Sequence, residues 1–198
     1  MEQGKAIDAV VHQYEDLLSA LGEFRRFSEE QLNWRPSAMQ WSMAECIEHI
    51  RLTSHIYAEW VELALDRAPH DLRQPGHHYR LKWISRFFIW LMEPRGTKIP
   101  NKIKTTAAFS PGESAYNAEL LIRNTEAVLT HNLELLERMR QYNATKLNTP
   151  LAFASFIKLP ILDALNFVAA HDRRHMQQAR NVLVYEAFPH EKKGTALA

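Results

Sequence analysis

The chain has 198 residues, of which 46% are hydrophobic and 24% are charged, the balance of an ordinary globular protein. This length predicts one domain, spanning residues 1–198, with a sizeable core. Lys and Arg number 24 against 23 Asp and Glu, so no excess of basic charge favours nucleic acid or an anionic membrane as a partner. A single cysteine excludes an internal disulfide and fits a reducing cytoplasm, and no apolar run reaches the 18 residues of a membrane span.

The first two long helices are predicted near the start of the chain. Apolar residues that recur at spacings of three and four predict a helix over about residues 5–27. A second helix is expected over about 42–66, because Ser42 can cap its first turn and Glu45 stands three residues later, as in a capping box. Trp41 precedes the cap, where a large apolar side chain can pack against the helix entry.

Residues 67–112 form a less regular middle segment that prolines and glycines divide. Within it, Tyr79–Met92 is predicted to be a shorter helix, dense in aromatic side chains. Lys82 and Arg86 interrupt its apolar run, which is also too short to cross a membrane. We interpret this helix as packed over the core or against a second subunit, with a lipid-facing surface as the alternative.

Two further long helices are expected, over about 111–141 and 160–187. The first of them follows a capping-box pattern with proline at residues 110–113. Between the two helices, Leu151–Lys158 is an apolar run too short to assign to strand or helix by its pattern. The sequence therefore predicts an all-α protein, a four-helix bundle with a long crossover and one additional short helix in the middle insertion.

Two histidines in the last predicted helix are candidate metal ligands. His171 and His175 are four residues apart, so their side chains lie one above the other on one helix face. The HExxH motif of zinc enzymes uses the same spacing, although Asp172 stands here in place of its glutamate. A third ligand must come from elsewhere, and His49 in the second helix is the candidate. Three imidazoles with one open position are typical of catalytic zinc.

Each candidate also has an ordinary structural interpretation. A histidine at the edge of a core is more often a hydrogen-bonded boundary residue than a ligand, and an HxxxH pair does not by itself establish a site. Glu45 could be a general base, although its capping role alone explains it. Gln178 shares a face with His171 and could hydrogen-bond a bound water, or be a plain boundary residue. Cys46 and His131 are alternative candidates for a further ligand.

The order of these motifs resembles the DinB/YfiT-like superfamily, over about residues 5–187. The resemblance is carried by Trp41-Ser42, His49 seven residues later, His171-x-x-x-His175 with Gln178, and the preceding Asn33-Trp34-Arg35-Pro36. It implies a bundle with up-down-down-up connectivity, often dimeric. It also implies a divalent metal, commonly zinc or nickel, held by three histidines, which correspond by position to His49, His171 and His175.

Members of this superfamily described as enzymes include thiol-dependent S-transferases, a mycothiol-dependent isomerase and metal-dependent hydrolases. The resemblance thus implies a cytoplasmic, homodimeric enzyme whose metal activates a low-molecular-weight thiol cofactor or water to act on a small-molecule substrate. The long insertion at residues 67–112 departs from a minimal member, so a family substrate does not carry over. The alternative is a non-catalytic, stress-related helical bundle with a structural metal or none, which would use the aromatic residues of Tyr79–Met92 as its binding surface.

Overall fold

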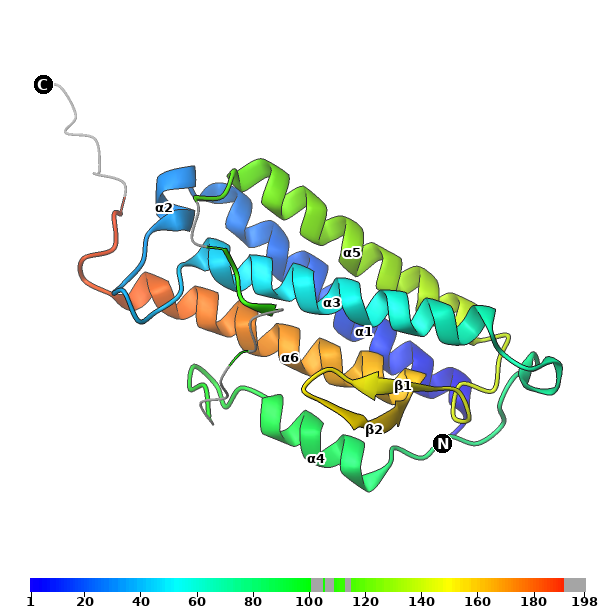
Figure 1. Ribbon diagram of the computed structural model, residues 1–198. Coiled ribbons are helices and arrows are strands. Elements are labelled where there is room, and N and C mark those ends of the chain that lie inside the picture. The colour runs from blue at the N-terminus through cyan, green and yellow to red at the C-terminus, as the bar shows by residue number, and fades with distance from the viewer. Residues whose placement is uncertain (101–104, 106–108, 113–114, 191–198) are drawn as a thin grey trace, which may run out of the picture.

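Four long helices form the body of the protein in the computed structural model, which describes residues 1–100, 105, 109–112 and 115–190 (Figure 1). They are α1 (Gln3–Gly22), α3 (Met43–Asp66), α5 (Ala118–Met139) and α6 (Ile161–Asn181). α1 and α6 run in one direction and α3 and α5 in the other, which confirms the up-down-down-up bundle (Figure 1). α3 packs against α5 and α6, and so does α1, so α1 and α3 occupy opposite corners.

Each long helix contributes an apolar stripe to the core of this bundle. In α1, the buried residues Ile7, Val10, Tyr14, Leu17 and Leu21 follow the helical spacing of three and four. α6 is buried over more of its circumference, since α1, α3 and α4 all pack against it. Polar residues on α6 are therefore held inside the protein, where they need hydrogen-bond partners or ligands.

The predicted capping box at the start of α3 is confirmed. The Ser42 hydroxyl oxygen accepts a hydrogen bond from the Glu45 backbone amide at 3.1 Å, and Glu45 Oε2 accepts one from the Ser42 amide at 2.9 Å. The short helix α2 (Glu29–Asn33) begins with the same arrangement at Ser28. The cap at Ser42 fixes where α3 starts, and therefore the position along the bundle of every side chain on α3.

Several predicted helix boundaries are wrong. The first helix ends at Gly22 and continues only as a 3-10 turn, η1 (Glu23–Arg26). The third long helix begins at Ala118 instead of near residue 111, because the Asn117 side chain caps it by accepting from the Leu120 amide at 2.9 Å. Residues 110–112 are not helical, and the rest of the predicted capping box, at 113, lies outside the described residues.

The last helix is also shorter than predicted. It starts at Ile161, with Pro160 as its N-cap, and ends at Asn181, after which only the 3-10 turn η4 (Val182–Val184) follows. The apolar run before it belongs to a hairpin of β1 (Asn148–Leu151) and antiparallel β2 (Ala154–Pro160). The protein is therefore mostly helical but not purely α, since a run too short to classify by its pattern forms strands.

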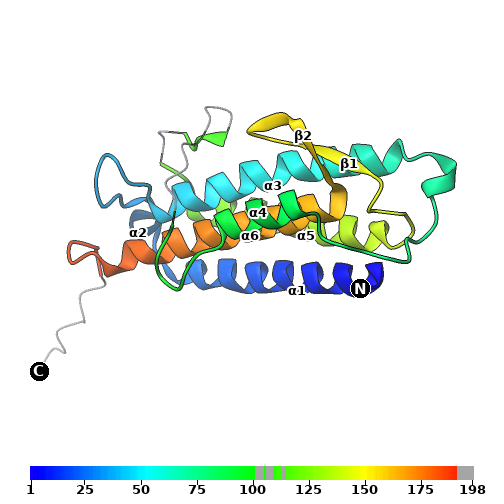
Figure 2. The ribbon, with the colours of Figure 1, turned by 90° about the horizontal axis from the view of Figure 1, so that it is seen from below.

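The aromatic helix of the insertion is α4 (Trp83–Met92), which lies against the outer side of α6 (Figure 2). It begins four residues after the predicted Tyr79, and a 3-10 turn, η2 (His70–Leu72), precedes it. Phe88 and Met92 pack with the hairpin and α6 in a second apolar cluster, which confirms packing over the core. Among the described residues, no helix has the length and apolar character needed to cross a membrane.

Candidate metal centre

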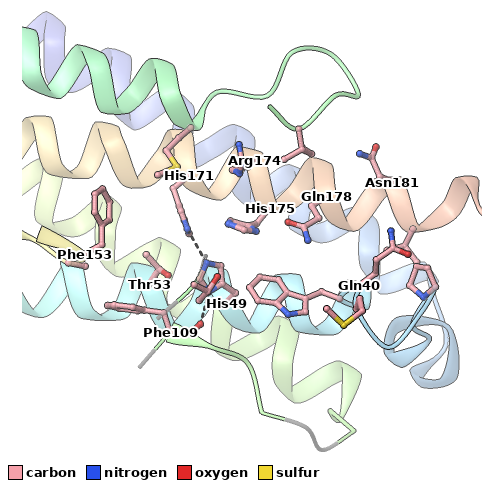
Figure 3. A pocket seen from close by; sticks show the side chains of 18 of the residues that line it. Gln40, His49, Thr53, Phe109, Phe153, His171, Arg174, His175, Gln178 and Asn181 are labelled. Carbon is pink, nitrogen blue, oxygen red and sulfur yellow. Dashed lines mark hydrogen bonds between the residues drawn. The ribbon is translucent and has the colours of Figure 1, made fainter. Parts of the chain in front are cut away.

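Three histidines converge between α3 and α6 (Figure 3). The ring centroids of His49, His171 and His175 lie 4.4 to 4.9 Å apart, and one nitrogen from each ring can be chosen so that all three lie within 4.8 Å of one another. No more than 8% of the surface of each residue is exposed. The sequence-based candidates thus form one buried cluster that could hold a metal ion.

Hydrogen bonds orient two of these rings toward a common point. His49 Nδ1 donates to the Phe109 carbonyl oxygen at 2.6 Å, and His171 Nδ1 donates to Asp172 Oδ1 at 3.0 Å. Both Nε2 atoms then carry lone pairs, yet they lie only 3.1 Å apart. Two lone pairs at this distance repel each other unless a proton or a metal ion lies between them.

The spacing of these two nitrogens fits a metal ion. Two imidazole nitrogens bound to tetrahedral zinc at about 2.05 Å are separated by about 3.3 Å. The Nε2 atoms of His49 and His171 are 3.1 Å apart, and a small rotation of either ring would bring them to this separation. In addition, Nδ1 of His175 is buried and has no hydrogen-bond partner among the described residues. An unsatisfied nitrogen of this kind is expected at a site completed by a ligand.

Burial keeps the cluster in the form that binds metals. Loss of water, together with a smaller effect of the nearby His171, lowers the pKa of His49 to about 3. Burial also lowers the pKa of His175 well below its usual range, although a side-chain hydrogen bond with Gln178 opposes this. His49 and His175 are therefore neutral at pH 7, with lone pairs available for coordination.

These lowered pKa values make the metal-free protein sensitive to acid. A histidine that is neutral when folded binds a proton after unfolding, so stability falls as the pH drops below about 6.5. For His49, a folded pKa of about 3 corresponds to a loss of about 2 kcal/mol between pH 7.0 and 5.0. Urea unfolding of chelator-treated protein measures this loss, and His49→Gln should reduce it by about that amount. Equal losses in both proteins would contradict the assignment.

Asp172 supports the cluster from behind His171. Its side chain is fully buried, and it accepts hydrogen bonds from His171 Nδ1 at 3.0 Å and from the Ser54 hydroxyl at 2.6 Å. Burial raises the pKa of Asp172, while these two hydrogen bonds oppose the rise. A carboxylate behind a metal-bound histidine fixes its ring and makes it a stronger ligand. Sequence analysis missed this role, although an aspartate beside a candidate ligand on a buried helix was the available signal.

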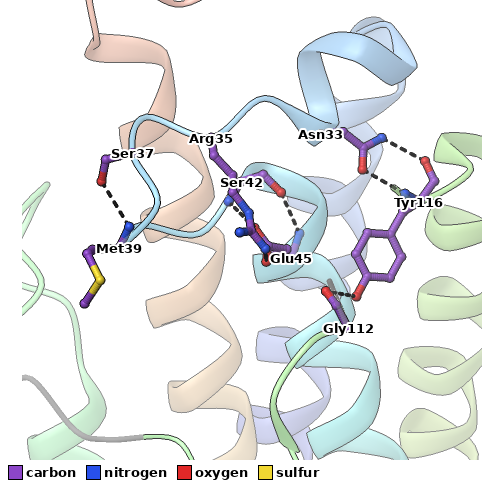
Figure 4. A network of polar contacts seen from close by, with 8 residues as sticks. All are labelled: Asn33, Arg35, Ser37, Met39, Ser42, Glu45, Gly112 and Tyr116. Carbon is purple, nitrogen blue, oxygen red and sulfur yellow. Dashed lines mark hydrogen bonds and ion pairs between the residues drawn. The ribbon is translucent and has the colours of Figure 1, made fainter. Parts of the chain in front are cut away.

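The two predicted catalytic residues lie in different places. Gln178 lines the cavity beside the histidines, within reach of a bound molecule. Glu45 does not line this cavity. Its carboxylate completes the capping box and also accepts from Arg35 Nε at 2.7 Å (Figure 4). The structure therefore gives Glu45 a role in holding the start of α3.

This placement leads to a test of Glu45. We expect Glu45→Gln to lower the free energy of unfolding by about 1 to 2 kcal/mol, because the charge-assisted contact with Arg35 is weakened at a buried cap. Metal content should stay unchanged. Thermal unfolding and elemental analysis of the same preparations measure both quantities. Loss of activity without loss of stability would instead support the predicted general base.

The other two candidate ligands lie outside the cluster. His131 is partly exposed on α5, where it pairs with Glu62 and Glu134. Cys46 is buried, and burial raises the pKa of its thiol, which disfavours the thiolate that a metal would need. Neither residue belongs to the group of neighbouring ligand atoms around His49.

A cavity of about 620 Å³ opens beside the histidines. Trp41 covers one side of it, with its ring centroid 5.0 Å from that of His49 and 5.9 Å from that of His175. This volume is sufficient for a small organic molecule. The site thus combines three candidate ligands on helices, an orienting carboxylate and space for a small molecule.

Comparison with known proteins agrees with this architecture. The chain is 20% identical to the uncharacterized protein YuaE of Bacillus subtilis (strain 168) over 165 residues, which cover 83% of this chain and 91% of that protein. No solved structure matches the chain. The family profile of the DinB superfamily matches residues 9–179, a span that includes nearly all of the four long helices and all three clustered histidines. The chain therefore belongs to the DinB superfamily.

Proposed function

We propose that this protein is a metal-dependent enzyme that acts on a small molecule, with zinc or nickel held by His49, His171 and His175. The observation that carries the proposal is the 3.1 Å separation of two Nε2 atoms whose rings are both oriented through Nδ1. Two neutral rings oriented in this way repel each other through their lone pairs, and a cation bound between them removes this repulsion.

A bound zinc or nickel ion would supply Lewis-acid chemistry, which favours the ionised form of a thiol cofactor or a water molecule at neutral pH. The protein contributes the geometry. Trp41 and Phe109 line the cavity beside His49, and Gln178 offers an amide to a molecule bound there. We propose S-transferase or hydrolase-like chemistry, because both need a nucleophile ionised beside a cavity that can hold its partner.

Metal analysis tests the first step of this proposal. Purified protein should contain close to one equivalent of metal per chain, and metal-loaded protein should be screened with low-molecular-weight thiols and electrophiles, and with hydrolysable esters and amides. Activity should disappear with a chelator and return with zinc or nickel. Folded wild-type protein that binds neither metal would overturn the proposal.

The second candidate function is a non-catalytic bundle in which the metal is structural or absent. The observation in its favour is an exposed aromatic surface on α4, formed by Trp83, Phe87 and Trp90. Chelation separates the two functions, since unfolding on metal removal indicates a structural ion. A folded metal-free protein that has lost activity indicates catalysis.

The same aromatic surface leads us to propose a homodimer. Trp83 is 79% exposed and Trp90 is 55% exposed, and a contiguous apolar patch of this kind commonly marks an interface. We expect wild-type protein to behave as a dimer in light scattering. In the double variant Trp83→Ser with Trp90→Ser, the dissociation constant of the dimer should rise at least about tenfold. Leu120→Ser, at an exposed site on α5, is the control. A monomeric wild type would contradict the proposal.

A further inference from the structure

The cavity has two chemically different ends, separated by the three histidines (Figure 3). Toward the start of α6, Tyr57, Phe153 and Phe167 line it with aromatic rings. Toward the end of α6, Gln178 and Asn181 line it with amides. The residues from α6 recur at helical spacing, so a single face of this helix forms the floor from end to end.

The charge of the cavity is positive. Among the described residues that line it there is no Asp, Glu or Lys, whereas Arg174 contributes a guanidinium next to the histidines. Arg174 is only 5% exposed, and its Nη1 donates to the Pro100 carbonyl oxygen at 2.6 Å. The charge of Arg174 therefore creates a positive field beside the histidine cluster. A divalent ion at the cluster would add to this field, so the site disfavours cationic ligands and favours anions.

We propose that the cavity binds a small organic carboxylate that carries an aromatic or bulky aliphatic group. The carboxylate lies at Arg174 beside the histidine cluster, and the apolar group lies among Tyr57, Phe153 and Phe167. This inference names the substrate class of the proposed enzyme, and it rests on that function only for the metal beside the carboxylate.

Two physical arguments support this class. A guanidinium binds a carboxylate through charge-assisted hydrogen bonds, which are strong where water is excluded, and Arg174 is only 5% exposed. At the aromatic end, Phe153 is held by ring contacts with Phe88 and Phe167, at centroid distances of 5.5 and 6.2 Å. This end is therefore a preformed apolar wall, which binds a hydrophobic group at low entropic cost.

The two ends also have a suitable separation. Phe167 and Arg174 are seven residues apart on α6, which corresponds to a rise of about 10 Å. A phenyl ring joined to a carboxylate by two methylene groups is shorter than this rise, and the long arginine side chain can reach across the remainder. 3-Phenylpropanoate is accordingly the probe, with 3-phenylpropanamide and propanoate as the ligands that lack the charge and the ring.

Calorimetric titration of metal-loaded and metal-free protein with the three ligands tests the proposal. Wild-type protein should bind 3-phenylpropanoate at least about tenfold more tightly than either other ligand. Arg174→Gln should weaken binding of 3-phenylpropanoate about tenfold and leave the amide unchanged, with Arg174→Lys in between. Phe153→Ala should weaken it about fivefold and leave propanoate unchanged.

Two matched variants control for general effects. Arg173→Gln removes the same charge one residue away, where the side chain contacts Gln13 and Glu93 instead of the cavity. Phe156→Ala removes the same ring from the same hairpin, at a site that is 86% exposed. Both controls should bind 3-phenylpropanoate within about twofold of wild type.

The result that overturns the inference is equal binding of acid and amide by wild-type protein, or the same loss in Arg173→Gln as in Arg174→Gln. Circular dichroism verifies the fold of each variant, and Arg174→Lys replaces Arg174→Gln if the latter unfolds. These experiments also distinguish failure of the proposed metal enzyme from failure of the carboxylate site. A protein that binds no metal but keeps the Arg174-dependent preference refutes the metal enzyme and supports the carboxylate site.

Discussion

Replacing His171 with alanine is expected to abolish stoichiometric metal binding at pH 7. His171 Nε2 lies 3.1 Å from that of His49, and its ring is fixed by Asp172, so no other described side chain can take its place without moving α6. Even the loss of a residue behind a ligand commonly costs 10 to 100-fold in metal affinity. We therefore expect a loss of more than about 100-fold, measured by competition with a chelator of known affinity.

The same loss is expected for His49→Ala and His175→Ala, because three ligands act on one ion. His131→Ala is the control, since this histidine lies on α5 and pairs with glutamates. Circular dichroism should show that all four variants remain helical. A His171→Ala protein that retains one equivalent of metal with wild-type affinity would contradict the assignment of the site.

Replacing Asp172 with asparagine is expected to produce the second large effect. Asp172 accepts hydrogen bonds from both His171 and Ser54, whereas an asparagine has one acceptor oxygen and a donor amide that faces one of the two partners. The His171 ring then loses its orientation or its basicity. We expect metal affinity to fall by about 10 to 100-fold and the free energy of unfolding to fall by about 1 to 3 kcal/mol.

Ser54→Ala separates these two consequences. It removes the hydroxyl that donates to Asp172 Oδ2 but leaves the contact between Asp172 and His171 in place. This variant should lose about 1 kcal/mol of stability and less than about tenfold in metal affinity. Equal metal affinity in wild type and Asp172→Asn would show that the carboxylate has only a structural role.

The parts of the fold that follow from local chemistry were predictable from the sequence. The start of α3 follows from Ser42 and Glu45, whose side chains cap backbone groups within four residues. His171 and His175 share a face because helical geometry requires it. The sequence does not show which helices pack against one another, because an apolar stripe indicates that a face is buried but not what covers it. The up-down-down-up order came from the family resemblance.

The parts that depend on long-range contacts could not be read from local patterns. Asn117 caps α5, whereas the upstream capping-box pattern of residues 110–113 predicts an earlier start of this helix. The hairpin of β1 and β2 forms from a run that a helix could also contain. The hydrogen bond that Asp172 accepts from Ser54, on another helix, depends on how α3 and α6 pack together. A pattern within one helix carries no information about such a partner.

The central claim is that three imidazoles from two helices bind one ion. Anomalous X-ray diffraction from crystals grown with zinc or nickel, recorded at the absorption edge of the metal, tests it most directly. We expect a single strong peak between α3 and α6, about 2.0 to 2.1 Å from one nitrogen each of His49, His171 and His175 for zinc. A peak elsewhere, or no peak with the three rings hydrogen-bonded to protein groups, would contradict the account.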